Sequence, residues 1–265
     1  QPNAMGGREV GGMANLMSGH RDLANPVHRE EIAKLWGVES VPAQPGKTAV
    51  EMFDAVKAGS IKAIWIACTN PAHSMPDLNK VLGALNAAEL VVVQDAYKQT
   101  DTNQYADVLL PATTWGEKEG TVTNSERRIT RVNAAIAPPA EAKHDWQIMV
   151  DFAQRLETRL AKAPSLFAFS NTEQIFNEHR ETTRGRDLDI SGLSYALLSE
   201  QGPQQWPFLT GDHFGKARLY EDGVFAKADG RAQFVAIPYQ GTADKTDARH
   251  PLHLLTGRLR DQWHT

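Results

Sequence analysis

The chain has 265 residues, a mass of 29.2 kDa and a formal net charge of −4, with 41% hydrophobic and 23% charged residues. This composition is typical of a globular protein and argues against disordered and fibrous classes. Its single cysteine excludes an internal disulfide and any iron–sulfur cluster built by this chain alone, because such clusters need about four thiolates. The acidic balance argues against nucleic-acid binding, and no apolar run approaches the roughly 20 residues of a membrane-spanning helix.

Neither end of the chain reads as a natural terminus. The sequence starts at Gln1 without an initiator Met, shows no signal-peptide pattern, and stops at Thr265 directly after a predicted strand. We therefore expect a slice of a longer protein.

Residues 1–25 are rich in glycine and show neither a helical nor a strand period. Glycine tolerates positive φ and lets the backbone approach a ligand closely. Arg8 would be unusual in a flexible linker, which is the alternative interpretation. We expect this segment to border a ligand site.

Two helices are predicted next. Asn25 can cap the first, Pro26 suits its first turn, and its apolar stripe ends at Gly37. The second is predicted over Thr48–Lys57, with Thr48 as cap and Glu51 at the capping-box position.

A regular alternation of strands and helices follows. Strands are predicted over residues 61–67, 90–94 and 108–110, and helices over 76–86 and 145–160. Strands that are apolar throughout and alternate with helices indicate a parallel sheet covered on both faces. The sequence therefore predicts an α/β, Rossmann-like fold for residues 26–162, with a mostly parallel sheet and helices on both faces.

The pattern changes after residue 162. Residues 163–215 are interpreted as an irregular connecting segment of loops and short helices. Residues 216–265 have a β-type pattern, with runs at 217–220, 224–227, 232–239 and 251–259. We expect this last part to begin a β-barrel domain that the chain truncates.

Polar residues follow each predicted strand, where ligands bind in open parallel sheets. Asn70 follows the first strand, Gln94 and Asp95 follow the second, and Lys118 lies in the loop after the third. Asp95 accepts hydrogen bonds only, which suits the N1–H and N2–H₂ of guanine or a ribose diol, and Lys118 suits a phosphate. The alternatives are a turn-forming Asp95 and a solvated ion pair at Lys118. Their convergence favours a dinucleotide site.

Several common motifs are missing. No G-x-G-x-x-G follows a strand, and the sequence has no P-loop, no G-x-S-x-G and no H-E-x-x-H. A standard NAD site, a P-loop and the commonest hydrolase and zinc-protease sites are therefore disfavoured. Cys68 is interpreted as a small buried hydrophobic residue, and His264 is the most interesting of the nine histidines.

The run VVVQDAYKQTDTNQYADVLLPATTWGEKEGTVTNSERR, residues 91–128, resembles the second dinucleotide-binding domain of molybdopterin oxidoreductases related to dimethyl-sulfoxide reductase. Residues 1–30 and 253–265 resemble the same superfamily, and all three segments are most similar to catalytic subunits of bacterial assimilatory nitrate reductases. The resemblance implies molybdenum held by two molybdopterin guanine dinucleotides, with this chain supplying the later of two Rossmann-like domains and the start of a C-terminal β-barrel.

The resemblance also implies site residues. Asn70, Gln94 and Asp95 would hold guanosine, and Lys118 and Asp145 would complete that site. A loop of the C-terminal domain would cross the pterin and phosphates; it comprises Thr256, Gly257, Arg258, Leu259, Arg260, Asp261, Gln262, Trp263, His264 and Thr265.

In the complete enzyme, this resemblance implies reduction of nitrate to nitrite in the cytoplasm, with an unidentified electron donor, no nucleic acid and no membrane insertion. The [4Fe–4S] cluster and the cysteine that ligates molybdenum are expected in the missing N-terminal part. Arg8 is a candidate for steering the nitrate anion, and the slice alone is expected to be inactive. The alternatives are a formate dehydrogenase of the same superfamily and a non-catalytic scaffold like the large peripheral subunit of complex I.

Overall fold

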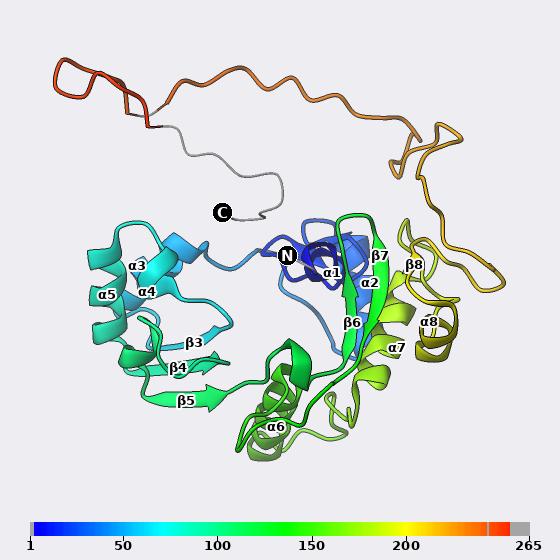
Figure 1. The fold of residues 1–265 in the computed structure, drawn as a ribbon, viewed down its shortest axis with the longest axis horizontal. Helices are drawn as coiled ribbons and strands as arrows, with labels where there is room; N and C mark the ends of the chain where they lie inside the picture. Colours follow the sequence, from blue (N-terminus) through cyan, green and yellow to red (C-terminus); the bar gives the residue numbers. More distant parts are fainter. Residues whose placement is uncertain (1–2, 243, 255–265) are drawn as a thin grey trace. The chain divides into compact units, whose positions relative to one another are not determined.

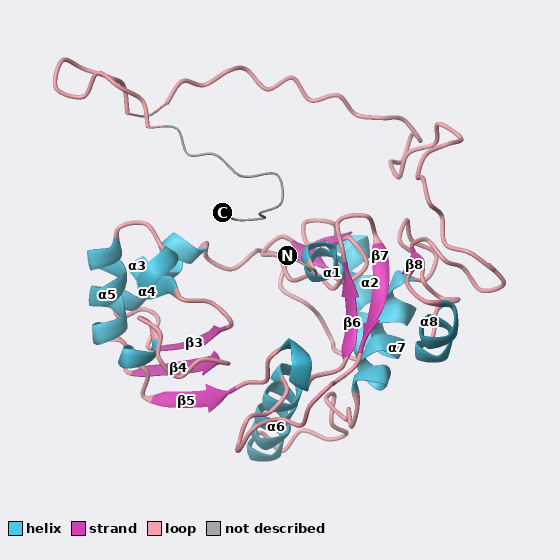
Figure 2. Ribbon diagram, viewed as in Figure 1, coloured by secondary structure: helices cyan, strands magenta, loops and turns pink. Residues whose placement is uncertain are grey.

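The computed structural model describes residues 3–242 and 244–254. The chain divides into two units, residues 2–216 and the residues from 217 onward, and each is described by itself (Figure 1). All helices and strands of the described residues lie in the first unit (Figure 2). None of the described helices combines the length and apolar character that crossing a membrane requires.

A three-stranded parallel sheet forms the centre of the α/β part. Its order is β3 (Ala63–Ala67), β4 (Leu90–Asp95) and β5 (Val108–Pro111), with Ile66 opposite Val93 and Gln94 opposite Leu110. On one face, Ile64, Ile66, Val91 and Val93 pack in one core with residues of α3 (Ala49–Lys57) and α5 (Leu78–Ala87).

Helix α6 (Asp145–Arg159) lies on the other face of this sheet, where Ile148 and Phe152 line a cavity together with Trp65 and Val92. Alternate side chains of a strand point to opposite faces, so Trp65 turns away from that core. Its ring meets Phe152 of α6 edge-on, with centroids 5.0 Å apart. The predicted α/β fold, with helices on both faces of a parallel sheet, is confirmed.

The caps of the two predicted helices are also confirmed. Helix α2 (Pro26–Trp36) begins where Asn25 Oδ1 accepts from Val27 N at 2.9 Å, and it ends at Gly37 with φ 66°. Helix α3 begins at the capping box of Thr48 and Glu51. The short helix α4 (Pro71–Ser74) and the 3₁₀ turns η1 (Asn103–Tyr105) and η2 (Trp115–Glu117) were not predicted.

A second, antiparallel sheet was also missed. It joins β6 (Gly120–Thr123), β7 (Arg128–Val132) and β8 (Gln204–Gln205). The β6–β7 turn is held by Asn124 Oδ1, which accepts from Glu126 N and Arg128 N at 2.9 and 3.0 Å. Arg127 has a φ of 66° in this turn.

The glycine-rich opening is more regular than expected. It forms helix α1 (Ala4–Glu9) and a short hairpin of β1 (Leu16–Met17) and β2 (Arg21–Asp22), so the absence of periodicity was misleading. Gly11 has a φ of 80°, and a Cβ there would lie 2.5 Å from the Met17 carbonyl carbon. The turn between α1 and β1 therefore requires glycine at this position.

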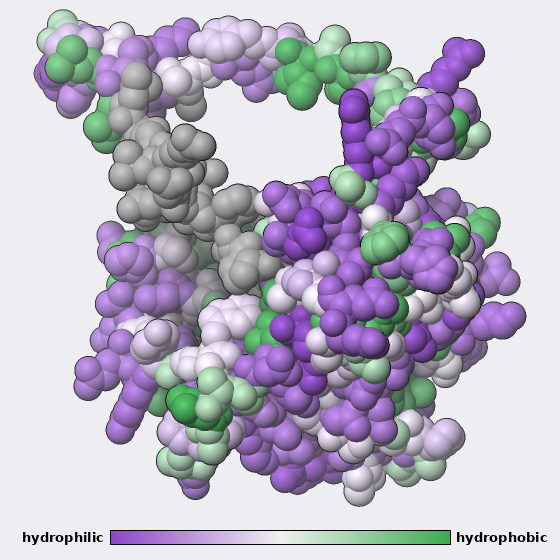
Figure 3. Space-filling view, turned by 45° about the vertical axis from the view of Figure 1, so that its right-hand side comes forward, coloured by the Kyte–Doolittle hydropathy of each residue, from purple (hydrophilic) through white to green (hydrophobic). Residues whose placement is uncertain are grey.

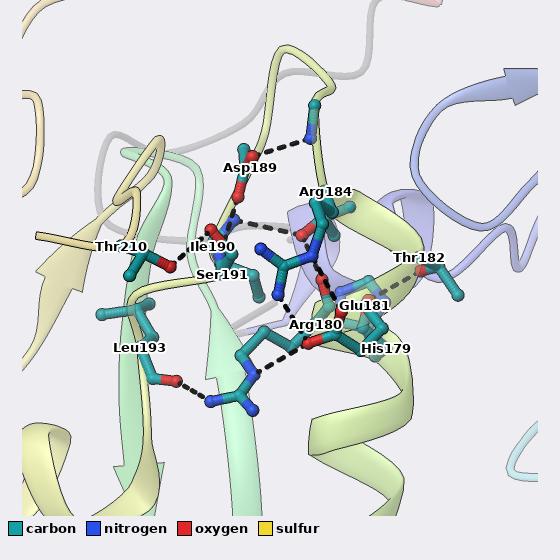
Figure 4. Close-up of polar contacts among 12 residues, drawn as sticks. His179, Arg180, Glu181, Thr182, Arg184, Asp189, Ile190, Ser191, Leu193 and Thr210 are labelled. Atoms are coloured by element: carbon teal, nitrogen blue, oxygen red, sulfur yellow. Dashed lines mark hydrogen bonds and ion pairs between the residues drawn. The ribbon is translucent and has the colours of Figure 1, made fainter.

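Residues 163–215 also contain more structure than short helices. They form α7 (Thr172–Thr183), α8 (Tyr195–Gln201) and β8. Figure 4 shows the contacts that fix the segment after α7: Arg180 Nη1 donates to Leu193 O at 2.7 Å, and Asp189 accepts from Gly185 N and Ser191 N at 2.7 and 2.8 Å.

The strands expected after residue 216 are not formed in the described residues 217–242 and 244–254. Phe234, Ile237 and Tyr239 are 96%, 84% and 93% exposed, and apolar side chains lie open along this segment (Figure 3). A strand needs a partner edge to pair with, and none of the described residues after 216 pairs in a sheet. The β-barrel domain remains a prediction for the longer protein.

Candidate functional site

The carboxyl ends of the three parallel strands surround a cavity of about 440 Å³. Residues after β3 and β4, the loop after β5 and the first residue of α6 line it together. They include Cys68, Thr69, Asn70, Asp95, Tyr97, Thr113, Trp115, Lys118 and Asp145. The cavity is where the strand-end reasoning placed a site.

Backbone pairing brings Asp145 to this edge although it lies far along the chain. Lys143 N donates to Pro111 O at 3.0 Å, and Thr113 N donates to Lys143 O at 3.1 Å. This pairing extends the end of β5, and α6 begins two residues later at Asp145. A carboxylate in the first turn of a helix is stabilised by the helix dipole.

Asp145 accepts hydrogen bonds from three side chains. Lys118 Nζ lies 2.9 Å from Oδ2, while Gln94 Nε2 and Cys68 Sγ lie 2.8 and 3.4 Å from Oδ1. Burial raises the pKa of Asp145, but the hydrogen bonds from Lys118 and Gln94 outweigh it, so its pKa lies below the ordinary value. The site therefore contains an ionised carboxylate paired with an ammonium group.

Gln94 lies behind Asp145 rather than on the cavity wall. Its side chain is 1% exposed, and its Oε1 is buried without a hydrogen-bond partner among the described residues. Through Nε2 it orients the Asp145 carboxylate. Direct contact of Gln94 with a ligand remains a prediction.

Asn70 and Asp95 each use one oxygen in local structure. Asn70 Oδ1 accepts from Thr102 N and Thr102 Oγ1 at 3.1 and 2.6 Å, and Asp95 Oδ1 accepts from Tyr97 N at 2.9 Å. No described residue bonds the Asn70 amide nitrogen or Asp95 Oδ2, and both residues line the cavity. Asp95 is thus a turn former that keeps one acceptor toward the site.

Cys68 differs from its interpretation as a buried hydrophobic residue. It is exposed, has a φ of 58° and lines the cavity. Its thiol is nevertheless partly enclosed; this burial, together with the charge of Asp145 and the hydrogen bond to it, raises the pKa of Cys68 to about 11. The thiol is therefore a neutral donor to Asp145 at physiological pH.

The sequence interpretation missed the aromatic side chains of this site. Trp115 and Tyr97 are 52% and 70% exposed at the cavity, and Lys118 Nζ lies 5.4 Å from the Trp115 ring centroid. A tryptophan in the loop after the third strand was the available signal, since such a ring can stack on a base or hold a cation.

The remaining predicted residues lie elsewhere. Arg8 is exposed on α1 and does not line this cavity. Residues 256–265, the predicted loop across the pterin, lie outside the described residues.

Comparison with known proteins identifies the family. Residues 3–155 match the family model of the molybdopterin oxidoreductases. The whole chain is 41% identical to a nitrate reductase of Synechocystis sp., 40% to the assimilatory nitrate reductase catalytic subunit of Bacillus subtilis and 34% to the F420-dependent formate dehydrogenase subunit alpha of Methanocaldococcus jannaschii. It spans 37% of the length of each of these relatives.

The fold has a counterpart among solved structures. Acetylene hydratase from Pelobacter acetylenicus aligns over 77% of this chain and 26% of its own, with a TM-score of 0.51 and 18% identity. The family match includes the parallel sheet, Gln94, Lys118 and Asp145. The chain belongs to the molybdopterin oxidoreductase family.

Proposed function

We propose that this chain is part of a molybdenum nitrate reductase and that its strand-end cavity holds the guanosine of one of two molybdopterin guanine dinucleotides. The observation that supports the proposal is the Asp145 cluster with Lys118 and Gln94, beside Asp95 and Asn70, in a chain similar to nitrate reductases over its whole length.

The chemistry of the cavity residues fits a guanine nucleotide. Asp95 Oδ2 offers an acceptor for the N1–H and N2–H₂ donors of guanine, and the Asn70 amide offers a donor for its acceptors. Lys118 supplies a cation for a phosphate, and the exposed Trp115 ring supplies a flat apolar surface. The buried Gln94 Oε1, which has no partner among the described residues, leaves one acceptor for a ligand donor or water.

When bound, the molybdenum cofactor supplies the oxygen-atom transfer that converts nitrate to nitrite. In this proposal the residues of this chain bind and orient its nucleotide, and Thr256–Thr265 contact the pterin and phosphates. Arg8 steers the nitrate anion. The [4Fe–4S] cluster and the cysteine on molybdenum come from outside this chain, as does the contact to an electron donor.

The test is Asp95→Asn in the holoenzyme. Asparagine retains the acceptor for Tyr97 N but replaces the second oxygen with an NH₂ group, which opposes the guanine donors. We expect the guanosine monophosphate released on acid hydrolysis to fall at least severalfold per protein. Glu89→Gln, at a surface ion pair with Lys62, is the control and should retain full nucleotide content. Unchanged nucleotide content in Asp95→Asn would refute the site.

The 34% identity to a formate dehydrogenase subunit supports a second candidate, a formate dehydrogenase with the same cofactor. Assays of the holoenzyme for nitrate reduction and for formate oxidation separate the two. A purified full-length protein that releases no guanosine monophosphate would instead favour a non-catalytic scaffold. We also propose a cytoplasmic location; because a periplasmic nitrate reductase of Desulfovibrio desulfuricans is 34% identical, cell fractionation is the deciding measurement.

A further inference from the structure

Glu9 is a buried carboxylate with two hydrogen-bond donors from distant parts of the chain. Its side chain is 2% exposed. Thr123 Oγ1 donates to Oε2 at 2.9 Å, and Trp206 Nε1 donates to Oε1. Burial raises the pKa of Glu9, opposed by these two hydrogen bonds. An acceptor at both oxygens is what the ionised carboxylate provides and a neutral amide does not.

Helix α1, which carries Glu9, needs such anchors. It has six residues, two of which are glycine, and a helix of this length has little stability of its own. Asn3 Oδ1 accepts from Thr123 N at 2.9 Å, so the start of the helix is fixed to the same residue of β6 as its end. Figure 1 shows α1 beside β6, and the two elements are in contact.

Arg8 precedes Glu9 and is exposed where Glu9 is buried. Successive helical residues point about 100° apart, so a helix that turns Glu9 into the protein turns Arg8 outward. Arg8 is exposed, and it forms no ion pair with any described residue. The Glu9 carboxyl is bonded to Thr123 and Trp206, which leaves the Arg8 cation available to an external anion.

Strand β6 connects this helix to the nucleotide cavity. The strand begins at Gly120, two residues after Lys118, and ends at Thr123 against Glu9. A short strand with a paired neighbour is a rigid spacer, because its backbone hydrogen bonds to β7 fix its conformation. Strand β6 therefore links the anchor of α1 at Thr123 to Lys118, two residues before the strand begins.

We infer that Glu9 is a positioning residue for substrate binding: it fixes α1 on β6 so that Arg8 presents its guanidinium at a defined place relative to the nucleotide end of the cofactor. The inference rests on the proposed function, through Arg8 as the residue that steers nitrate.

The test is the nitrate KM of the holoenzyme with Glu9→Gln. Glutamine has one acceptor oxygen, so one charge-assisted bond of the anchor is weakened: its NH₂ either opposes Trp206 Nε1–H or faces the Thr123 hydroxyl, which must then turn to accept. We expect KM to rise about fivefold, with kcat and nucleotide content within about twofold of the unaltered enzyme. A purely electrostatic role predicts the reverse sign, because removing a negative charge beside Arg8 would strengthen anion binding and lower KM.

A double-mutant cycle separates positioning from general damage. In an Arg8→Ala enzyme, Glu9→Gln should change KM no further, whereas a merely structural role gives the same change in both backgrounds. Thr123→Val, which removes one donor and keeps the charge, should raise KM in the same direction and covers the case in which Glu9→Gln does not fold. Glu30→Gln, at an exposed glutamate of α2, is the matched control with unchanged KM.

The outcomes separate a failure of this inference from a failure of the proposed function. An unaltered or lowered KM in Glu9→Gln, an equal effect in the Arg8→Ala background, or an Arg8→Ala enzyme with normal KM overturns the role of Glu9 while nitrate reduction stands. A holoenzyme that does not reduce nitrate refutes the proposed function and this inference with it.

Discussion

Lys118 Nζ and Asp145 Oδ2 lie 2.9 Å apart and join two elements that are separated by 27 positions in the sequence. Lys118 precedes β6, whereas Asp145 is the first residue of α6. Their side chains are only 26% and 33% exposed, so solvent screens the pair less than it screens an ion pair on the open surface. The pair therefore ties the antiparallel sheet to the helix that covers the parallel one.

Asp145→Asn should destabilise the protein by about 1 to 2 kcal/mol, because a partly buried, charge-assisted hydrogen bond is lost while Lys118 stays in place. The pKa of Asp145 is lowered, so its contribution is present above its usual value of 3.8 and is lost as the pH falls through the lower folded value. Urea denaturation at pH 7 measures the effect. Asp151→Asn removes an exposed partner of Lys143 on the same helix and should cost less than about 1 kcal/mol. Equal costs for the two variants would contradict this account.

His179 should make the protein sensitive to mild acid. Burial, with the nearby charge of His20 as a smaller cause, lowers the pKa of His179 to about 4 from 6.5. Between these two pKa values His179 is protonated in the unfolded chain but neutral in the folded one. The free energy of unfolding therefore falls as the pH drops from about 6.5 to about 4. The loss is at most on the order of 3 kcal/mol.

His179→Gln should remove this part of the pH dependence. When the pH is lowered from 7 to 4.5, the urea midpoint of the variant should fall less than the urea midpoint of the unaltered protein. His73→Gln, at an exposed histidine, serves as the control and should leave the change of the urea midpoint with pH as it is. A parallel pH dependence in the His179 variant and the unaltered protein would disprove the assignment.

Gly7 and Gly11, which are four residues apart, provide a matched test of the turn after α1. Gly11→Ala places a Cβ at φ 80° and 2.5 Å from the Met17 carbonyl carbon, so we expect a loss of more than about 2 kcal/mol. Gly7→Ala meets no atom within 4 Å inside a helix and should stabilise the protein by about 0.5 to 1 kcal/mol. Differential scanning calorimetry should show Tm shifts of opposite sign; two shifts of the same sign would rule out the strain argument.

Local signals in the sequence were sufficient to predict those helices whose ends are marked by capping residues. The Asn25 cap, the Gly37 end and the Thr48–Glu51 capping box involve residues no more than four apart, and all three are present as predicted. The meeting of Asp95 and Lys118 at one cavity followed from the rule that parallel strands end at the same edge of a sheet.

Other features required information that the sequence shows less directly. Residues 121–123 and 129–132 are rich in β-branched side chains on either side of a turn, but no strand was predicted there, and the β6–β7 hairpin was missed. The partner of Gln94 lies 51 residues away, and that of Glu9 lies 197 residues away, so neither contact leaves a local pattern. The apolar runs after residue 216 have strand-like composition, yet the side chains of Phe234 and Tyr239 are almost fully exposed.

The contact between Glu9 and Trp206 sets an order for events during synthesis. At about 5 to 20 residues per second, a ribosome needs roughly 10 to 40 s to extend the chain from one residue to the other. During that interval Glu9 has Thr123 as a partner but lacks its bond to Trp206, although the α/β sheet can already form. The newly made chain should therefore remain open to proteases around Glu9 until the tryptophan emerges.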